Sequence, residues 1–375
     1  MRQAGLFGLS DHLKRLSADG DPLEALGRIV DFESFRPTLV AALAYGDGTK
    51  GGRPPYDPVV MLKVLILAAQ NNVSDARMEY LIRDRLSWLR FLGFDLGAPT
   101  PDANTIRLFR EKLTEANALE ALFVDFDRQL RERGYLAMGG QIVDATQVAA
   151  PKQRNTQAEK DAIKAGQKAG EIWPEEPARA AQKDTDARWT LKFAKAKPTA
   201  EGKPGIDIAI PSFGYKSSIS ICRTFGFIRN GKTTDAARFD GRMLRDAVMR
   251  DNTASDVWAE GTKVPLASAN GKFPEGDRTY RSQSNEKWLC SMGRVSCIHH
   301  KKPQGRSMPE HIRQGNAAKS KVRARVEHVF AHQKDKKGLF IRTIGIKRAE
   351  ARITLANLTY NMNRLIFHER RAATG

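Results

Sequence analysis

The chain has 375 residues with 62 Lys and Arg against 43 Asp and Glu, a formal net charge of +19. This length suits about two domains with a sizeable core, and so strong a positive charge favours a polyanionic partner, above all nucleic acid. No apolar run reaches the ~20 residues that a bilayer crossing needs, and the first residues lack the apolar core of a secretory signal. We therefore expect no membrane partner and a cytoplasmic location.

The N-terminal part, residues 1–135, is predicted to be an all-α domain. The stretch "DPVVMLKVLILAAQNN" is apolar around most of a helix circumference, as in a buried central helix. "DARMEYLIRDRLSWLRFLG" repeats apolar residues at three- and four-residue steps and ends at a glycine that favours a helix stop. "TPDANTIRLFREKL" then opens with a start signal and continues as a short basic helix.

The last two of these segments allow two interpretations. The second helix carries Asn104, Arg107 and Arg110, so the pair could be a DNA-reading helix-turn-helix. An ordinary helical hairpin with a solvated charged face explains the same pattern. Arg107 and Arg110 are the candidate DNA-binding residues of this domain.

A second domain, residues 136–375, is predicted to be α/β. A strand begins at "GGQIVDATQV", followed by a polar excursion at 151–205 with one possible helix. Strand patterns return in "GIDIAIP", "YKSSISICR", "GFIRNGKTT", "SDVWAE" and "VSCIHH", and helical patterns in "DGRMLRDAVMR", "SNEKWLCSMG" and from about Lys319 and Lys347. Hairpin strands that give way to alternating strands and helices indicate a mixed sheet with helices on its faces.

Three acidic positions in this domain are candidates for chemistry. Asp144 follows an apolar strand, and either Glu260 or Asp277 follows the "VWA" strand. Glu327 lies in "SKVRARVEHVFAHQKDKK", at the border of an apolar helical stripe and four residues after Arg323. The plainer explanation for Glu327 is an i,i+4 surface pair with Arg323, worth only ~0.3–0.5 kcal/mol.

Carboxylates from two strand ends and a helix suit a pair of Mg²⁺ ions, which prefer carboxylate, water and phosphate oxygens. Surrounding Lys and Arg would then hold a phosphate backbone. Zinc is a weaker candidate, because Cys290 and Cys297 are too far apart for a tight knuckle with His299 and His300.

Many segments in one order resemble bacterial insertion-sequence DDE transposases, particularly the insertion-sequence-five family. They include "GRPPYDPVVMLKVLIL", "GGQIVDATQVAAPKQRNT", "QKDTDARWT", "TYRSQSNE" and "RTIGIKRAEARITLANLTYNMNRL". The resemblance implies a ribonuclease-H-like mixed sheet with flanking helices, preceded by an all-α domain that binds the terminal inverted repeats of the element.

The resemblance also implies roles for particular residues. Asp144 matches the first catalytic aspartate, and Glu327 matches the glutamate of a signature in which Arg323 and Lys334 keep their spacing. Ser320 stands where that signature has tyrosine. The DNA-binding candidates are Arg323, Lys334, Arg325, Lys321, Arg107, Arg110 and Lys216.

The second aspartate is displaced in this chain. Residues 260–276 separate "VWA" from the Asp of "DRTYRS", so that Glu260 follows the strand while Asp277 has the expected residue type and neighbours. Because a looped-out insertion adds little closure cost, we expect a surface loop at 260–276 and favour Asp277 over Glu260.

The implied function is binding of element ends, metal-dependent phosphodiester hydrolysis and strand transfer. Asp144, Asp277 and Glu327 would hold two Mg²⁺ ions per active site, with Mn²⁺ as a substitute. The expected partners are double-stranded DNA, as element ends and target, and further copies of the chain on that DNA, at the bacterial nucleoid. The alternative is a catalytically inactive transposase descendant that acts only as a DNA-binding protein.

Overall fold

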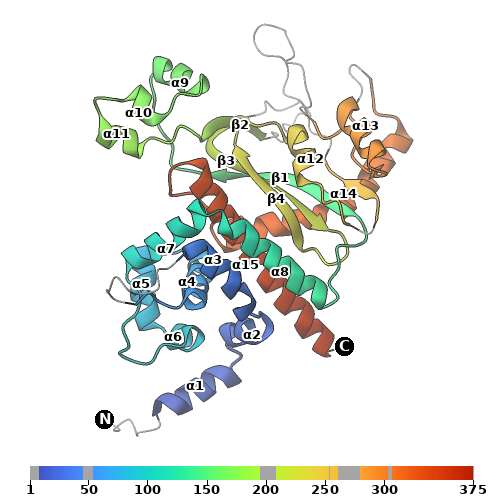
Figure 1. Ribbon diagram of the computed structural model, residues 1–375. Coiled ribbons are helices and arrows are strands. Elements are labelled where there is room, and N and C mark those ends of the chain that lie inside the picture. Colours follow the sequence, from blue (N-terminus) through green and yellow to red (C-terminus); the bar gives the residue numbers. More distant parts are fainter. Residues whose placement is uncertain are drawn as a thin grey trace, which may run out of the picture. The chain divides into compact units, whose positions relative to one another are not determined.

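A computed structural model describes residues 8–44, 54–194, 208–252, 254–260, 279–302 and 306–374. The chain divides into two compact units (Figure 1). Unit 1 comprises Met1–Tyr135 and Thr354–Gly375, and unit 2 comprises Leu136–Ile353. The sequence places the whole C-terminal part in the second domain, whereas the structure assigns Thr354–Gly375 to unit 1.

Unit 1 is helical in its described part. Its helices are α1 (Gly8–Ala18), α2 (Pro22–Ile29), α3 (Arg36–Leu43), α4 (Pro58–Asn71), α5 (Asp75–Asp84), α6 (Leu86–Leu92), α7 (Ala103–Glu115) and α8 (Ala118–Glu132), with a 3₁₀ turn η1 (Glu33–Phe35). Helix α4 is buried along most of its length, as its apolar circumference predicts. Across the described segments, none of the helices has both the length and the apolar character needed for a membrane crossing.

Side-chain caps fix where these helices begin. The Asp57 carboxylate accepts the backbone N–H groups of Val59 and Val60 at the start of α4, and Asp102 accepts that of Thr105 at the start of α7. The single stretch from Asp75 to Gly93 forms two helices, because Arg85 between them is in an extended conformation.

The last helix, α15 (Ile346–Thr374), explains the assignment of the C-terminal residues. Its apolar residues Leu358, Met362 and Leu365 are buried, and the Tyr135 hydroxyl donates to the Glu369 carboxylate at 2.9 Å. A helix with so wide an apolar surface must pack on other elements to exclude water, and from Thr354 onward it does so within unit 1.

Unit 2 is built on a mixed six-stranded sheet, which confirms the predicted α/β class. Its strands are β1 (Gln141–Ala149), β2 (Arg188–Ala194), β3 (Ile208–Cys222), β4 (Ile228–Asp235), β5 (Asp256–Trp258) and β6 (Val295–Ser296). The order is β2-β3-β1-β5-β6, with β4 also paired to β3. Strand β3 is antiparallel to β1, β2 and β4, while β5 is parallel to β1 and β6 is parallel to β5.

Strand β3 differs from the sequence prediction, which has two separate strands, "GIDIAIP" and "YKSSISICR". They form one strand of 15 residues. Its first half pairs with β2 and its second half with β1 and β4, so one strand serves two sets of partners.

Helices cover both faces of the sheet, as alternating side chains of β1 show. Val143 packs in a buried cluster with Leu244 of α12 (Leu244–Ala247) and Leu289 of α13 (Gln283–Ser291). The next residue, Asp144, contacts Arg323 of α14 (Glu310–Ala331). Since neighbouring strand residues point to opposite faces, α14 lies on the face opposite to α12 and α13. A 3₁₀ turn η2 (Asp240–Met243) precedes α12, and a π-helical turn η3 (His332–Lys336) follows α14.

The polar excursion has more structure than its composition predicts. Between 151 and 205 it forms α9 (Gln157–Lys164), α10 (Ala169–Ile172) and α11 (Pro177–Gln182), and it also contains β2, a strand of the sheet that the sequence does not predict. Trp173 is buried among them, and the Glu159 carboxylate accepts the Trp173 indole N–H at 2.9 Å and an Arg179 N–H at 2.6 Å. One tryptophan and one paired carboxylate therefore organise a segment with almost no other apolar core.

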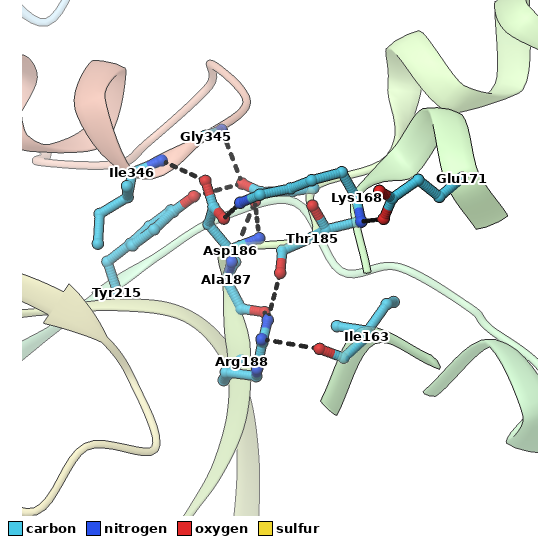
Figure 2. Close-up of polar contacts among 11 residues, drawn as sticks. Ile163, Lys168, Glu171, Thr185, Asp186, Ala187, Arg188, Tyr215, Gly345 and Ile346 are labelled. Carbon is cyan, nitrogen blue, oxygen red and sulfur yellow. Dashed lines mark hydrogen bonds and ion pairs between the residues drawn. The ribbon is translucent and has the colours of Figure 1, made fainter. Parts of the chain in front are cut away.

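Two aspartates tie the segment after α11 to the sheet and to the start of α15, and Figure 2 shows the contact of the second, Asp186, with Ile346. Buried Asp184 accepts the Tyr215 hydroxyl at 2.6 Å and the backbone N–H groups of Asp186 and Ala187 at 2.9 and 3.0 Å. Asp186 accepts the N–H of Ile346 at 3.0 Å, at the N-terminus of α15, where a carboxylate is favoured by the helix dipole.

Candidate active site

The candidate site begins with the register of the parallel strands. Strand β1 pairs with β5 through Gln141 opposite Val257 and Ile142 opposite Trp258. The same one-to-one register, continued two residues further, places Asp144 beside Glu260. Residues in one row of a sheet point to the same face, so both carboxylates belong to the face that α14 covers.

Helix α14 brings the third carboxylate and a cation to this row. The Arg323 Nη1 atom lies 2.6 Å from Asp144 Oδ2, 3.0 Å from Glu327 Oε1 and 3.9 Å from Glu260 Oε2. Because both oxygens contact the same nitrogen atom, Asp144 Oδ2 and Glu327 Oε1 are at most 5.6 Å apart, the sum of the first two distances. The arrangement is therefore more than an i,i+4 surface pair, because Arg323 joins the helix to the central strand.

Burial divides the three carboxylates. The Asp144 side chain is 11% exposed, whereas those of Glu260 and Glu327 are 54% and 55% exposed. Burial raises the pKa of Asp144 to about 7, with Arg323 acting in the opposite direction. Burial by itself would lower the pKa of Arg323, but Asp144, Glu260 and Glu327 raise it overall.

The donor chemistry fits a hard divalent cation. All three acidic groups offer carboxylate oxygens, which Mg²⁺ prefers, and they already surround one positively charged atom. Within the described ranges, however, no group of three His, Cys, Asp or Glu side chains is close enough to hold a metal ion. With the guanidinium among the carboxylates, metal binding requires Arg323 to give up these contacts.

Asp277 lies outside the described residues, as do residues 261–276 of the predicted surface loop. The preference for Asp277 over Glu260 therefore stays a prediction. Glu260 itself lies next to the end of β5 and within ion-pair distance of Arg323.

Two of the basic candidates on α14 are exposed. Lys321 and Arg325 flank Arg323, and one Arg325 N–H donates to the Arg223 carbonyl at 2.5 Å. Lys334 lies in the π-helical turn η3 rather than in α14. A regular helix, at 100° per residue, would place Lys334 on nearly the same side as Glu327, but a π turn departs from that value.

The basic candidate on β3 is not brought to this site. Lys216 on β3 is paired with Asp240 at 2.8 Å, and its side chain is 15% exposed. Its partner across the sheet is Gln147, three residues from Asp144, so the alternation of side chains places Lys216 on the opposite face.

In unit 1 the two candidate arginines differ. Arg110 makes a two-bond ion pair with Asp75, at 2.7 Å for each bond, which joins α7 to α5. Arg107 is exposed and donates to Asn104 at 2.7 Å. Only Arg107 presents an exposed side chain, so Arg110 is better explained as a structural contact.

Two polar residues near the carboxylates were not expected there, since the sequence does not single out Tyr280 and points to His299 only as a weak zinc candidate. Tyr280 is fully buried, and burial raises the pKa of its hydroxyl, with Asp144, Asp240 and Glu260 contributing. The His299 imidazole approaches Ser320 Oγ to 3.4 Å, and burial, followed by Arg323, lowers its pKa. One sequence pattern could have pointed to His299: Asp144, Glu260 and His299 each directly follow a short apolar strand segment.

Comparison with known proteins adds one finding. No solved structure matches the chain. Residues 11–112, all within unit 1, match the family model described as a transposase domain (DUF772), which supports a transposase family for this chain.

Proposed function

We propose that the protein is a DDE transposase of the insertion-sequence-five kind. It binds the terminal inverted repeats of an element, hydrolyses a phosphodiester to free a 3′-hydroxyl and joins that hydroxyl to target DNA. The match of residues 11–112 to a transposase domain supports the transposition function. The observation that carries the catalytic part is the convergence of Asp144, Glu260 and Glu327 on Arg323 Nη1.

The sheet of unit 2 also supports the proposal. Strands β4, β3 and β1 are successive antiparallel neighbours, and β5 and β6 follow β1 in parallel. This order, with the first strand in the centre, is compatible with the ribonuclease-H-like fold that the sequence resemblance implies. Open sheets with parallel strands bind their ligands beyond the carboxyl ends of those strands, which is the edge near Glu260.

Each residue has a proposed part. Asp144, Glu327 and either Glu260 or Asp277 would hold Mg²⁺, which when bound activates water or a hydroxyl and stabilises the leaving oxygen. Arg323 neutralises the carboxylates before the metal binds. Its planar guanidinium is also suited to bidentate contact with phosphate.

The test is cleavage of linear duplexes that carry the DNA flanking the gene. We expect Mg²⁺-dependent cuts at one position on each side, and we expect Asp144→Asn and Glu327→Gln each to abolish them. Glu310→Gln is the matched control, because Glu310 is an exposed, ion-paired carboxylate on the same helix α14. Equal cleavage by all three variants would refute the catalytic assignment.

The second aspartate needs its own comparison. Asp277→Ala and Glu260→Ala are measured separately, and the variant that loses cleavage identifies the third carboxylate. Tight binding of the flanking DNA without cleavage, with Mg²⁺ or Mn²⁺, would instead favour the inactive descendant that only binds DNA. Glutamate in place of the strand-end aspartate is the observation that makes this second function worth testing.

A further inference from the structure

The row that contains Asp144 and Glu260 continues onto the next strand. Strand β5 pairs in parallel with β6 through Asp256 opposite Val295 and Val257 opposite Ser296. The pairing extends beyond the strand ends, because the His299 N–H donates to the Ala259 carbonyl at 3.3 Å. The same register places His299 beside Glu260, as the third member of the row.

A row of helical side chains faces this row of the sheet. Ser320, Arg323 and Glu327 are spaced by three and four residues, so they share one face of α14. Arg323 contacts the two carboxylate positions of the row, and Ser320 Oγ lies 3.4 Å from His299 Nε2. The imidazole is therefore held at the end of the same site by a strand on one side and by a helix on the other.

The His299 end of the row differs from the carboxylate end in charge. Lys319 and Arg281 donate to the Ile298 carbonyl at 3.0 and 2.7 Å, which brings two cations to the residue before His299, and Arg281 also pairs with Glu286 at 3.7 Å. Carboxylates repel phosphate unless a cation lies between them, whereas an imidazole N–H beside cations attracts it.

We propose that His299 is a substrate-contacting residue of this site, whose imidazole hydrogen-bonds a DNA backbone phosphate next to the one that is cleaved. The inference rests on the proposed function for the nature of the substrate. Adjacent strands are ~4.8 Å apart, so His299 is one strand spacing from Glu260 and two from Asp144. That offset assigns it to a neighbouring phosphate, with Ser320 fixing the orientation of the ring.

The first test measures binding of the gene-flanking duplex with Ca²⁺ in place of Mg²⁺, by fluorescence anisotropy. A hydrogen bond to a charged group corresponds to about tenfold or more in affinity, so His299→Ala should weaken binding by about tenfold. His299→Gln, which keeps a donor, should recover part of the loss. His300→Ala is the matched control, because His300 is the adjacent, exposed histidine, and it should change the Kd less than about twofold.

A second readout reports the contact directly. Diethyl pyrocarbonate modifies exposed imidazoles, and mass spectrometry assigns the modified sites. Bound duplex should protect His299 and leave the modification of His300 unchanged. No protection of His299, together with unchanged affinity of His299→Ala, overturns the inference.

Single methylphosphonates, placed at one position at a time around the mapped cut, identify the phosphate. One flanking substitution should weaken binding of the wild-type protein about tenfold and have no further effect in His299→Ala. Sensitivity at the cleaved phosphate alone would refute the assignment. If the wild-type protein binds but never cleaves, the catalytic proposal fails, while the affinity and protection results still decide whether His299 contacts DNA.

Discussion

Replacing Asp144 by asparagine should stabilise the metal-free protein while it removes the proposed activity. The carboxylate is buried, and burial raises its pKa to about 7 despite the nearby Arg323. In the unfolded chain an aspartate has a pKa of about 3.9. The folded state therefore holds this carboxylate in its charged form at a cost that an uncharged side chain of the same shape avoids.

The size of the expected stabilisation and its pH dependence follow from the difference between the folded and unfolded pKa values of Asp144. A pKa near 7 in the folded chain against about 3.9 in the unfolded chain costs about 4 kcal/mol at pH 8. Replacing the carboxylate by the asparagine amide should recover only about 1–3 kcal/mol of this cost, because the amide NH₂ group faces the N–H donors of Arg323. Between about pH 4 and 7 the Asp144 side chain binds more protons in the folded than in the unfolded state, so its contribution to the unfolding free energy falls as pH rises through this window.

The assay is urea unfolding in EDTA at pH 5.5 and pH 8. Asp144→Asn should be more stable than the wild-type protein at pH 8, with a smaller gap at pH 5.5. Asp184→Asn is the matched control, since buried Asp184 accepts the Tyr215 hydroxyl and two backbone N–H groups, and its substitution should destabilise by about 2–4 kcal/mol. A less stable Asp144→Asn at pH 8 would refute the reasoning.

Three further outcomes are expected. Arg110→Ala should lower the unfolding free energy by about 1–3 kcal/mol and be non-additive with Asp75→Ala in a double-mutant cycle, whereas Arg107→Ala should leave thermal stability nearly unchanged. Tyr215→Phe should cost about 1–2 kcal/mol and little more when Asp184→Asn is already present, measured by urea unfolding. The affinity for linear duplex should fall steeply between low and physiological salt, because phosphate contacts release counterions; a nearly flat dependence in anisotropy titrations would argue against DNA as the partner.

Several features of this protein are determined locally, so the sequence reveals them by itself. The N-caps at Asp57 and Asp102 need only a carboxylate within reach of nearby N–H groups. The buried helix α4 follows from its apolar circumference, and the mixed α/β class follows from periods of two and 3.6 residues. The sequence also singles out Asp144, which follows an apolar run, and Glu327, which lies at a helix border, as candidates; in the structure Asp144 lies within β1 rather than at its end.

Tertiary structure alone decides which of these residues meet. Periodicity shows that a strand has two faces, but it does not name the strand beside it or the register, so the row of Asp144, Glu260 and His299 is not readable along the chain. The same limit explains why two basic residues proposed to bind DNA from the sequence are instead engaged in ion pairs. Lys216 pairs with Asp240 on the opposite face, and Arg110 pairs with Asp75, because long-range partners determine where a charged side chain goes. The same holds for the C-terminal helix α15. Its apolar surface predicts that the helix is buried, but not that its residues from Thr354 onward pack within unit 1.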